Sequence, residues 1–257
     1  MKQLSRRLFL KTSGLGVAAF GAMQAPLFGQ ARRRVIVIGG GWGGATAAKY
    51  IRLTDPSIEV TLLEPNKEFI SCPFSNLVLA GVESLKGLTL NYNGLRKHGV
   101  KIRHEAAAAI EPDKKRLRVG KDSLEYDRLI VSPGIDFLWE QIDGLAQAKD
   151  KVLHAWKAGP QTVQLAQQLQ SMADGGVVVM TVPPVAYRCP PGPYERASMI
   201  AWFLKTKKPK SKLIVLDANK DIVSKTGLFK AIFKEYEANI EYRPSQNAEK
   251  IDIGGWR

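Results

Sequence analysis

Residues 34–51 decide the fold, and they read RVIVIGGGWGGATAAKYI. The first five are rich in β-branched side chains and predict a buried strand over 34–38, whereas the last seven have the pattern of a helix. Between the two, Gly39, Gly41 and Gly44 keep the spacing GxGxxG. In this motif the first glycine permits a tight turn, the second lets a pyrophosphate approach the backbone, and the third lets helix and strand pack closely. The phosphates would lie at the positive N-terminus of the helix.

A second predicted strand supports this interpretation. Residues 58–63 read IEVTLL, and Glu64 follows at twenty positions after Gly44. An acid at that place accepts hydrogen bonds from an adenosine ribose. The alternative is a glycine-rich turn with an incidental acid. The succession of strand, glycine turn, helix, strand and acid favours a dinucleotide site formed by Gly39, Gly41, Gly43, Gly44 and Glu64.

The motif alone does not distinguish FAD from NAD. Its place at the start of the chain that would follow a leader is typical of FAD in reductases with two dinucleotide domains. Residues 126–134, YDRLIVSPG, resemble the strand and turn that close the FAD domain of that superfamily, which makes Pro133 and Gly134 candidate cofactor-binding residues. Residues 100–104 and 116–119 are predicted to be strands of a small meander.

The second half of the chain repeats the pattern without the glycines. Residues 159–172 predict a helix and 177–180 a strand, after which a nicotinamide domain would show another GxGxxG. Instead 181–195 reads TVPPVAYRCPPGPYE, with five prolines in eleven residues, a rigid turn with few free N–H groups. A helix over 194–205 and a strand ending in Asp217 are predicted next. The fold class is therefore α/β with two Rossmann-like domains of the dinucleotide-binding type, the second degenerate and incomplete at the C-terminus, and NAD(P) is not expected to bind it.

The N-terminus resembles an export address. Residues 5–11, SRRLFLK, are similar to the twin-arginine signal, and the apolar stretch over 15–28 is too short to span a bilayer. We expect residues 1–31 to be a signal peptide, the protein to be periplasmic, and the mature chain to have no transmembrane segment. The alternatives are an amphipathic start or a membrane anchor. Residues 1–31 hold four basic residues and no acid, so subtracting them from the net charge of +14 leaves +10.

The composition excludes several classes of protein. With 257 residues, 24% charged and 45% hydrophobic, the chain is neither a disordered protein nor a disulfide miniprotein. Nucleic-acid binding is not expected, because part of the basic charge belongs to the leader. Two cysteines cannot build a four-cysteine zinc site, and the three histidines do not cluster, so no metal site is predicted. The histidines are His98, His104 and His154, and core packing is favoured for His154.

Two other features allow two interpretations each. The five lysines of residues 205–212 are either a solvated connection or a docking patch for an acidic cytochrome. Glu195 either tunes the protonation of a nearby thiol or stabilises the dipole of the helix that begins there.

Four segments carry a resemblance to a known family: residues 35–66, SCPFSNLVLAG at 71–81, LHAWKAGPQT at 153–162 and YRCPPGPYERAS at 187–198. The chain resembles the flavoprotein subunits of flavocytochrome c sulfide dehydrogenase. The resemblance implies that Cys72 is the covalent attachment point of FAD through an 8α-thioether. It also implies that Cys189 belongs to a redox-active pair beside the flavin ring, with its partner in the C-terminal region of longer members. The alternative is that the two cysteines pair with each other or lie inert in the core.

The resemblance also implies a reaction. Sulfide adds to the disulfide to give a persulfide and a thiolate, the thiolate passes two electrons to FAD, and the electrons leave singly to a c-type cytochrome subunit in a heterodimer. The alternatives are an enzyme like the sulfide:quinone reductases, or a catalytically incomplete flavin-binding or accessory protein. Since family members continue well beyond residue 257, we expect a first FAD-domain segment over 32–150 and a truncated second domain over 151–257.

Overall fold

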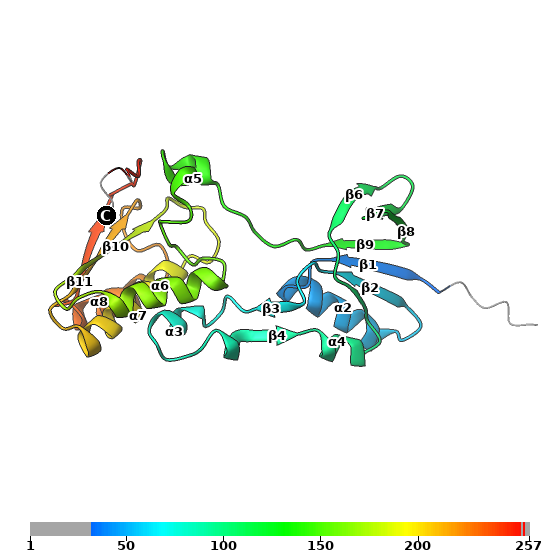
Figure 1. Ribbon diagram of the computed structural model, residues 1–257, viewed down its shortest axis with the longest axis horizontal. Coiled ribbons are helices and arrows are strands. Elements are labelled where there is room, and N and C mark those ends of the chain that lie inside the picture. Colours follow the sequence, from blue (N-terminus) through cyan, green and yellow to red (C-terminus); the bar gives the residue numbers. More distant parts are fainter. Residues whose placement is uncertain (1–31, 253, 255–257) are drawn as a thin grey trace, which may run out of the picture. The chain divides into compact units, whose positions relative to one another are not determined.

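The computed structural model describes residues 32–252 and 254 (Figure 1). The predicted export signal lies outside these residues. The chain divides into two compact units. Unit 1 contains the described residues up to Glu64 together with Leu95–Ser132, and unit 2 contains Pro65–Gly94 together with the described residues from Pro133 onward. Each unit is described by itself.

Unit 1 is built on a parallel sheet in the order β5-β2-β1-β9. Its strands are β1 (Arg34–Ile38), β2 (Glu59–Leu63), β5 (Lys101–Arg103) and β9 (Arg128–Val131), and α2 (Trp42–Thr54) connects β1 to β2. The antiparallel sheet β6 (Ala107–Glu111), β7 (Arg116–Val119) and β8 (Asp122–Glu125) lies on the face opposite α2 (Figure 1). Because both faces are covered, β1 is apolar almost throughout rather than alternating. The predicted strand, helix, strand succession is confirmed.

One strand prediction for unit 1 is wrong in its pairing. Residues 100–104 were expected in the small meander, but β5 pairs in parallel with β2 and extends the main sheet. The backbone N–H of Glu64 donates to the carbonyl of Arg103 at 3.0 Å, which continues that pairing. Only 116–119 lies in the meander, as β7. A three-residue strand carries too little pattern to choose its neighbour, so contacts distant in sequence decide.

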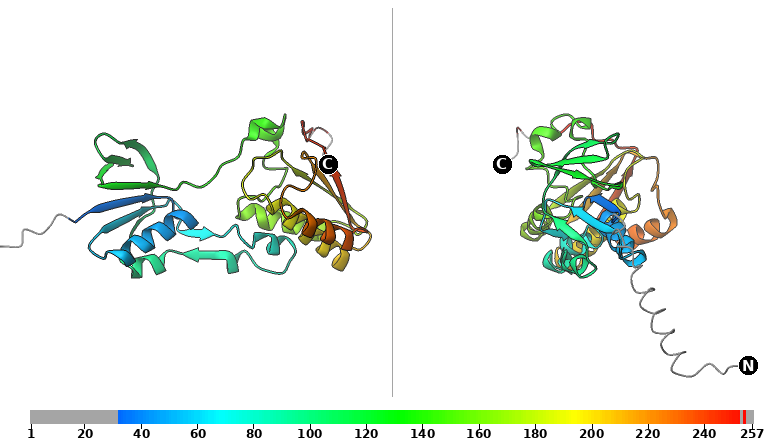
Figure 2. Two further views of the ribbon diagram at one scale, coloured as in Figure 1. Left: turned by 180° about the vertical axis from the view of Figure 1, so that it is seen from behind. Right: turned by 90° about the vertical axis from the view of Figure 1, so that its right-hand side faces the viewer.

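Unit 2 is built on a second parallel sheet, in the order β10-β11-β12. These strands are β10 (Val177–Val182), β11 (Lys212–Asp217) and β12 (Ile240–Pro244). Three helices cover one face of the sheet, namely α6 (Pro160–Ser171), α7 (Gly192–Lys207) and α8 (Thr226–Glu235) (Figure 2). On β10, Val177 and Val179 are more than half exposed. The predicted second β-α-β succession is therefore present.

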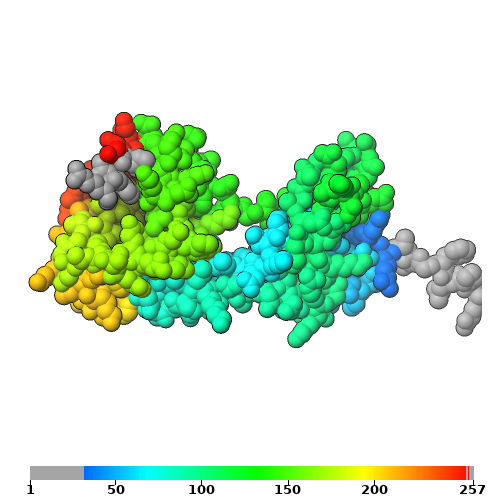
Figure 3. All heavy atoms as spheres, viewed as in Figure 1, coloured from blue at the N-terminus to red at the C-terminus, as the bar shows by residue number. Residues whose placement is uncertain are grey.

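The stretch Pro65–Gly94 packs with the late half of the chain. It contains the two-stranded sheet of β3 (Glu68–Ile70) and β4 (Thr89–Asn91), the helix α3 (Ser75–Leu79) and the 3₁₀ turn Lys86–Leu88. Leu79 and Ala80, at the end of α3, belong to the core cluster that α6 and α7 also form, and in Figure 3 teal atoms of this part of the stretch lie against the yellow-green atoms of the late half of the chain. The two compact units thus differ from a division of the chain near residue 150. The assignment of residues 32–150 and 151–257 to two domains stays a prediction.

The remaining short elements are α4 (Asn93–Lys97), the 3₁₀ turn Trp139–Gln141 and α5 (Leu145–Ala148). Within the part of the chain that the structure describes, no helix is both long and apolar enough to cross a membrane.

Candidate functional site

The glycine turn of unit 1 has the close geometry that its motif predicts. Gly39 has a φ of 95°, in the left-handed region that favours glycine. A Cβ atom on Gly44 would lie 1.8 Å from the carbonyl oxygen of Gly39, so no larger residue fits there without moving the turn. Gly41 is the N-cap of the thirteen-residue helix α2, whose first turn has no acidic side chain. The turn therefore presents a helix N-terminus that an anion can approach.

Glu64 lies beside this turn. Its Oε2 accepts a hydrogen bond from the backbone N–H of Gly40 at 2.8 Å, and the residue is half-buried at the end of β2. The carboxylate is thus held at the same edge of the sheet as the helix N-terminus. Together, the glycine turn and Glu64 fit the pyrophosphate and the ribose of a dinucleotide such as FAD.

The remaining predicted cofactor-binding residues are Gly43, Pro133 and Gly134. A Cβ atom on Gly43 would meet the Oγ of Ser132 at 2.7 Å, so the turn packs closely on the end of β9. Pro133 and Gly134 follow β9 and are grouped with unit 2. Gly134 has a φ of 87°, as expected of a turn glycine, and the role of both residues toward a cofactor stays a prediction.

Cys72 lies in unit 2, between β3 and α3, and is exposed and unpaired. Its Sγ accepts a hydrogen bond from the backbone N–H of Ala158 at 3.4 Å and lies 3.9 Å from the carbonyl oxygen of Trp156. The segment around residue 72 is thus joined to the segment 153–162, two of the four stretches that carry the family resemblance. The sulfur remains accessible to a ligand.

Arg196 was not among the predicted site residues. It connects the stretch 187–198 to the stretches 71–81 and 153–162. The residue is only 4% exposed and projects from α7. Its Nε donates to the Oδ1 of Asn76 at 2.9 Å, and its two terminal nitrogens donate to the carbonyls of His154 and Ala155, the latter at 3.0 Å. The guanidinium also stacks on the ring of Trp156, 3.4 Å from its centroid. A signal was available, because Arg196, Ile200 and Leu204 share the helical spacing of a buried face.

Cys189 occupies the turn before α7 and is also exposed and unpaired. It has a φ of 60°, an uncommon conformation for a residue other than glycine. A Cβ atom on Gly192 would lie 3.3 Å from the Cys189 Sγ and 3.7 Å from the ring of Trp156. The backbone of Trp156 thus borders Cys72, and its ring lies against the same glycine as the Cys189 sulfur.

The predicted role of His154 in packing agrees with its contacts. Its ring meets Phe137 edge-on, with 4.5 Å between centroids, and its Nδ1 accepts the backbone N–H of Trp156 at 3.0 Å. Burial lowers the pKa of His154, and the charge of Arg196 acts in the same direction. The neutral imidazole therefore helps to fix the backbone at Trp156.

The other charged candidates lie outside this cluster. Glu195 is exposed in the first turn of α7, where it can stabilise the helix dipole. Among the lysines of 205–212, Lys205 lies over the ring of Tyr236 and Lys212 pairs with Glu241 at 3.5 Å. These contacts suit a connecting stretch, and docking of a cytochrome stays a prediction. Within residues 32–252 and 254, no three His, Cys, Asp or Glu side chains are grouped as metal ligands.

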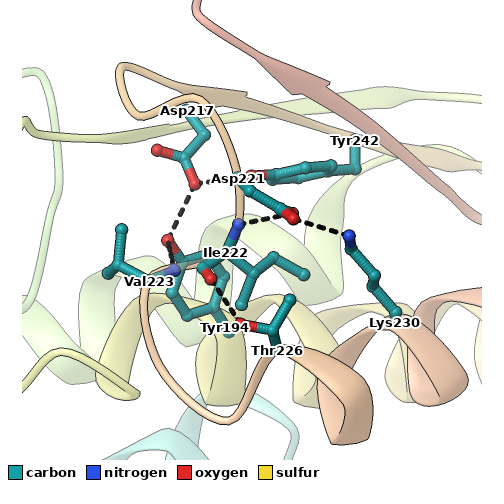
Figure 4. A network of polar contacts seen from close by, with 8 residues as sticks. All are labelled: Tyr194, Asp217, Asp221, Ile222, Val223, Thr226, Lys230 and Tyr242. Atoms are coloured by element: carbon teal, nitrogen blue, oxygen red, sulfur yellow. Dashed lines mark hydrogen bonds and ion pairs between the residues drawn. The ribbon is translucent and has the colours of Figure 1, made fainter.

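The second β-α-β succession ends in an acid of a different kind. Asp217 is fully buried at the end of β11, and its Oδ2 accepts hydrogen bonds from the hydroxyls of Tyr194 at 2.8 Å and Tyr242 at 2.9 Å (Figure 4). Its Oδ1 accepts two more from Asn219, through the backbone N–H and the side-chain amide, both at 2.8 Å. Burial raises the pKa of both tyrosines, so they stay protonated and donate. All four of these hydrogen bonds to the Asp217 carboxylate come from groups of the protein itself.

The comparisons with known proteins agree with this architecture. Residues 33–180 match the family described as pyridine nucleotide-disulphide oxidoreductase. Residues 162–255 match the central region of the sulfide dehydrogenase [flavocytochrome c] flavoprotein chain. A sulfide dehydrogenase [flavocytochrome c] flavoprotein chain from Chlorobaculum thiosulfatiphilum is 63% identical over 46 residues, which are 18% of this chain and 96% of that sequence.

The chain belongs to the pyridine nucleotide-disulphide oxidoreductases, among the flavocytochrome c sulfide dehydrogenase flavoproteins. This family of flavin-dependent oxidoreductases implies FAD as the cofactor. The mitochondrial sulfide:quinone oxidoreductase of Mus musculus is 28% identical over 185 residues, 70% of this chain and 41% of that protein. The solved sulfide:quinone oxidoreductase of Aquifex aeolicus is 22% identical with a TM-score of 0.73, covering 86% of this chain and 52% of that one. This chain therefore spans about half or less of the length of these sulfide:quinone oxidoreductases, and the likeness to the solved structure shows the fold alone.

Proposed function

We propose that this chain is the flavoprotein part of an enzyme that oxidises sulfide and passes the electrons to a c-type cytochrome subunit. One observation carries the proposal. In unit 2, contacts of Arg196 and Trp156 bring together the segment around Cys72, residues 153–162, and the start of α7, which follows Cys189. The identity to a flavocytochrome c flavoprotein chain supports the same assignment.

Different residues would hold the different parts of FAD. The turn of Gly39, Gly41, Gly43 and Gly44 would receive the pyrophosphate, and Glu64 would accept hydrogen bonds from the adenosine ribose. Cys72 would carry the flavin through a thioether, and its exposed sulfur suits that role. When bound, FAD supplies an acceptor that takes electrons as a pair and releases them singly.

Cys189 would carry the sulfur chemistry. In a disulfide with a second cysteine, its sulfur is an electrophile that hydrosulfide can attack. The new S–S bond makes a persulfide, the old S–S bond breaks, and the leaving sulfur keeps the electron pair as a thiolate. The second cysteine is the one that the family resemblance places in the C-terminal region of longer members. Reading the gene beyond codon 257 tests this point, since a continuing frame with one more cysteine supports it.

A quinone is the second candidate for the electron acceptor. Three of the matched relatives are described as sulfide:quinone or sulfide-quinone enzymes, at 23–28% identity. The discriminating measurement is sulfide oxidation with either oxidised cytochrome c or a soluble quinone as acceptor. Faster turnover with the cytochrome supports the proposal, and faster turnover with the quinone supports the second candidate.

The principal test uses the two cysteines as controls for each other. The purified protein is precipitated with acid, and flavin fluorescence is measured in the pellet and in the supernatant. We expect flavin in the pellet for the unmodified protein and for Cys189→Ser, but in the supernatant for Cys72→Ser. Anaerobic sulfide should bleach the flavin of a gene product that contains the second cysteine and leave that of its Cys189→Ser variant oxidised. If that gene product holds flavin that sulfide does not reduce, the protein is an accessory flavin-binding protein rather than the enzyme.

We also propose that NAD(P) does not bind unit 2. Asp217, which would face the ribose in a nicotinamide domain, already accepts four hydrogen bonds from protein groups. The turn before α7 contains four prolines, a fifth is the second residue of α7, and the turn offers few N–H groups to a phosphate. NADH titration should leave the flavin oxidised, and reduction at micromolar NADH would overturn this part of the proposal.

The cellular location is a further proposal. The twin-arginine-like segment at residues 5–11 would deliver a folded flavoprotein to the periplasm, where a c-type cytochrome partner is available. Replacing Arg6 and Arg7 by lysine should keep the protein in the cytoplasmic fraction. Export of that double variant at the unmodified level argues against the twin-arginine route.

A further inference from the structure

Arg196 is a buried charge without an acidic partner in the described part of the chain. Its three hydrogen-bond acceptors are all neutral: the Asn76 amide and the carbonyls of His154 and Ala155. No ion pair links it to a carboxylate within residues 32–252 and 254. Removing a cation from water is unfavourable unless something at the site uses its charge. Four polar and aromatic contacts hold the guanidinium in place, so the site is built for it.

The ionisable group whose charge acts on Arg196 is the sulfur of Cys72. The guanidinium lies 3.4 Å from the centroid of the Trp156 ring, and the Cys72 Sγ lies 3.9 Å from the Trp156 carbonyl oxygen. Asn76, which accepts the Nε hydrogen bond, is four residues after Cys72. Burial lowers the pKa of Arg196 to about 9, while charge on Cys72 acts in the opposite direction. Arg196 therefore stays positive at neutral pH.

The contacts of Arg196 also fix the hydrogen-bond donor that faces Cys72. The N–H of Ala158 lies 3.4 Å from the sulfur, two residues after the stretch 154–156 that Arg196 contacts. Both a nearby cation and an N–H donor favour an anionic sulfur, which is the reactive form of cysteine. The exposed Arg188 and Cys189 lack these contacts in the described structure.

We propose that Arg196 is the positioning residue for covalent flavin attachment: its buried charge stabilises the anionic sulfur of Cys72, and its guanidinium fork holds the backbone that aligns that sulfur. The inference deepens the proposed function and rests on it. In the attachment, a carbon–sulfur bond replaces a carbon–hydrogen bond of the flavin 8α-methyl group. The thiol and the methyl group each lose one hydrogen, and dioxygen in aerated buffer takes up both protons and the electron pair as hydrogen peroxide.

The first test measures the Cys72 sulfur directly, without flavin. In a Cys189→Ser background, flavin-free protein reacts with iodoacetamide at neutral pH, and the rate of alkylation of Cys72 is followed by mass spectrometry. Arg196→Gln should react about tenfold more slowly, because one charge interaction of ordinary size is worth about one order of magnitude. Arg196→Lys, which keeps the charge and loses the fork, should react at an intermediate rate. Arg188→Gln removes an exposed arginine of the same segment and should leave the rate unchanged.

Circular dichroism and urea unfolding show which variants keep the fold. Arg196→Lys decides the outcome if Arg196→Gln does not fold, because it must then still react more slowly than the unmodified protein. Equal rates for the unmodified protein and for folded Arg196→Gln or Arg196→Lys overturn the proposal. Equal rates for the Lys and Gln variants overturn the role of the charge.

The second test separates this inference from the proposed function. Aerated apoprotein is incubated with FAD, precipitated with acid, and the flavin retained in the pellet is measured. The unmodified protein and Arg188→Gln should retain it, and Arg196→Gln should retain about a tenth as much after a short incubation. If the unmodified protein retains no flavin, the covalent part of the proposed function fails, whereas the alkylation rates still decide whether Arg196 activates Cys72. If Arg196→Gln retains flavin at the unmodified rate, the inference fails and the proposed function stands.

Discussion

Two β-α-β successions that end in an acid lie within the described residues 32–252, and the two acids have opposite environments. In unit 1, β1, α2 and β2 lead to Glu64, which is half-buried and bonds to the glycine turn through Gly40. In unit 2, β10, α7 and β11 lead to Asp217, which has no exposed surface and is bonded by two tyrosines and Asn219 (Figure 4). The topology is the same in both, so topology does not decide which unit can hold a nucleotide. The two units differ in their turn residues and in the exposure of the acid.

The difference has a direct physical origin. Glycines at 39 and 44 let the backbone of unit 1 turn tightly and leave N–H groups at the start of α2. Prolines in the turn before α7 remove such groups, and the Tyr194 hydroxyl donates a hydrogen bond to the Oδ2 of Asp217. In unit 2 the acid at the end of β11 is thus part of the core.

The largest expected effect is the loss of the buried acid. Asp217→Ala would remove the acceptor that the buried Tyr194 hydroxyl, the half-buried Tyr242 hydroxyl and the Asn219 side chain share. Because each buried group left unbonded costs on the order of 1–3 kcal/mol, the free energy of unfolding should fall by about 3–5 kcal/mol. Urea denaturation measures it, with Glu64→Ala as the matched control in unit 1, expected within about 1 kcal/mol of the unmodified protein. Equal losses in the two variants would remove the contrast between the acids.

The contrast also explains how far the sequence could predict the structure. The glycine spacing at 39–44 and the acid at 64 were enough to predict β1, α2 and β2 of unit 1, because each position has a steric or charge requirement. The hydrogen bonds that Tyr194 and Tyr242 donate to Asp217 could not be predicted. The two tyrosines are distant in sequence and approach Asp217 only when α7 and β12 pack beside β11. The pairing of β5 with β2 and the contacts of Arg196 were missed for the same reason.

The next largest effect is expected from a Cβ atom added to the turn of unit 1, compared with one added at the start of α7 in unit 2. On Gly44 a Cβ atom would meet a backbone oxygen at 1.8 Å, whereas on Gly192, at the start of α7, it would meet the movable Cys189 side chain at 3.3 Å. Gly44→Ala should lower the free energy of unfolding by about 2–3 kcal/mol, and Gly192→Ala should stay within about 1 kcal/mol. In a Cys72→Ser background, where bound flavin can be titrated by fluorescence, Gly44→Ala should weaken FAD binding by about a hundredfold. Tight flavin binding by Gly44→Ala would show that the turn is not the phosphate site.

A smaller effect is expected from the charge of Glu64. Glu64→Gln keeps an oxygen that can accept the Gly40 N–H but loses the charge that strengthens hydrogen bonds to a ribose. FAD binding in the Cys72→Ser background should weaken about tenfold, with little change in stability. Asp217→Asn is the matched control and should do the reverse, lowering stability without changing flavin affinity. A flavin affinity that depends on Asp217 rather than on Glu64 would contradict the assignment of the nucleotide to unit 1.

The smallest effect is a pH dependence that belongs to unit 2. The Tyr194 hydroxyl donates to Asp217 and accepts the backbone N–H of Val223 at 3.2 Å, and burial raises its pKa. In the unfolded chain tyrosine ionises near pH 10, so the stability that Tyr194 provides is complete below about pH 10 and declines as the pH rises further. Tyr194→Phe should therefore cost about 1 kcal/mol at pH 7 and clearly less at pH 11, measured as paired urea titrations. Tyr50, which is exposed on α2, supplies the control, because Tyr50→Phe should leave stability unchanged at both pH values. A Tyr194→Phe cost that is constant between pH 7 and 11 would mean that the hydroxyl is not kept neutral by its burial beside Asp217.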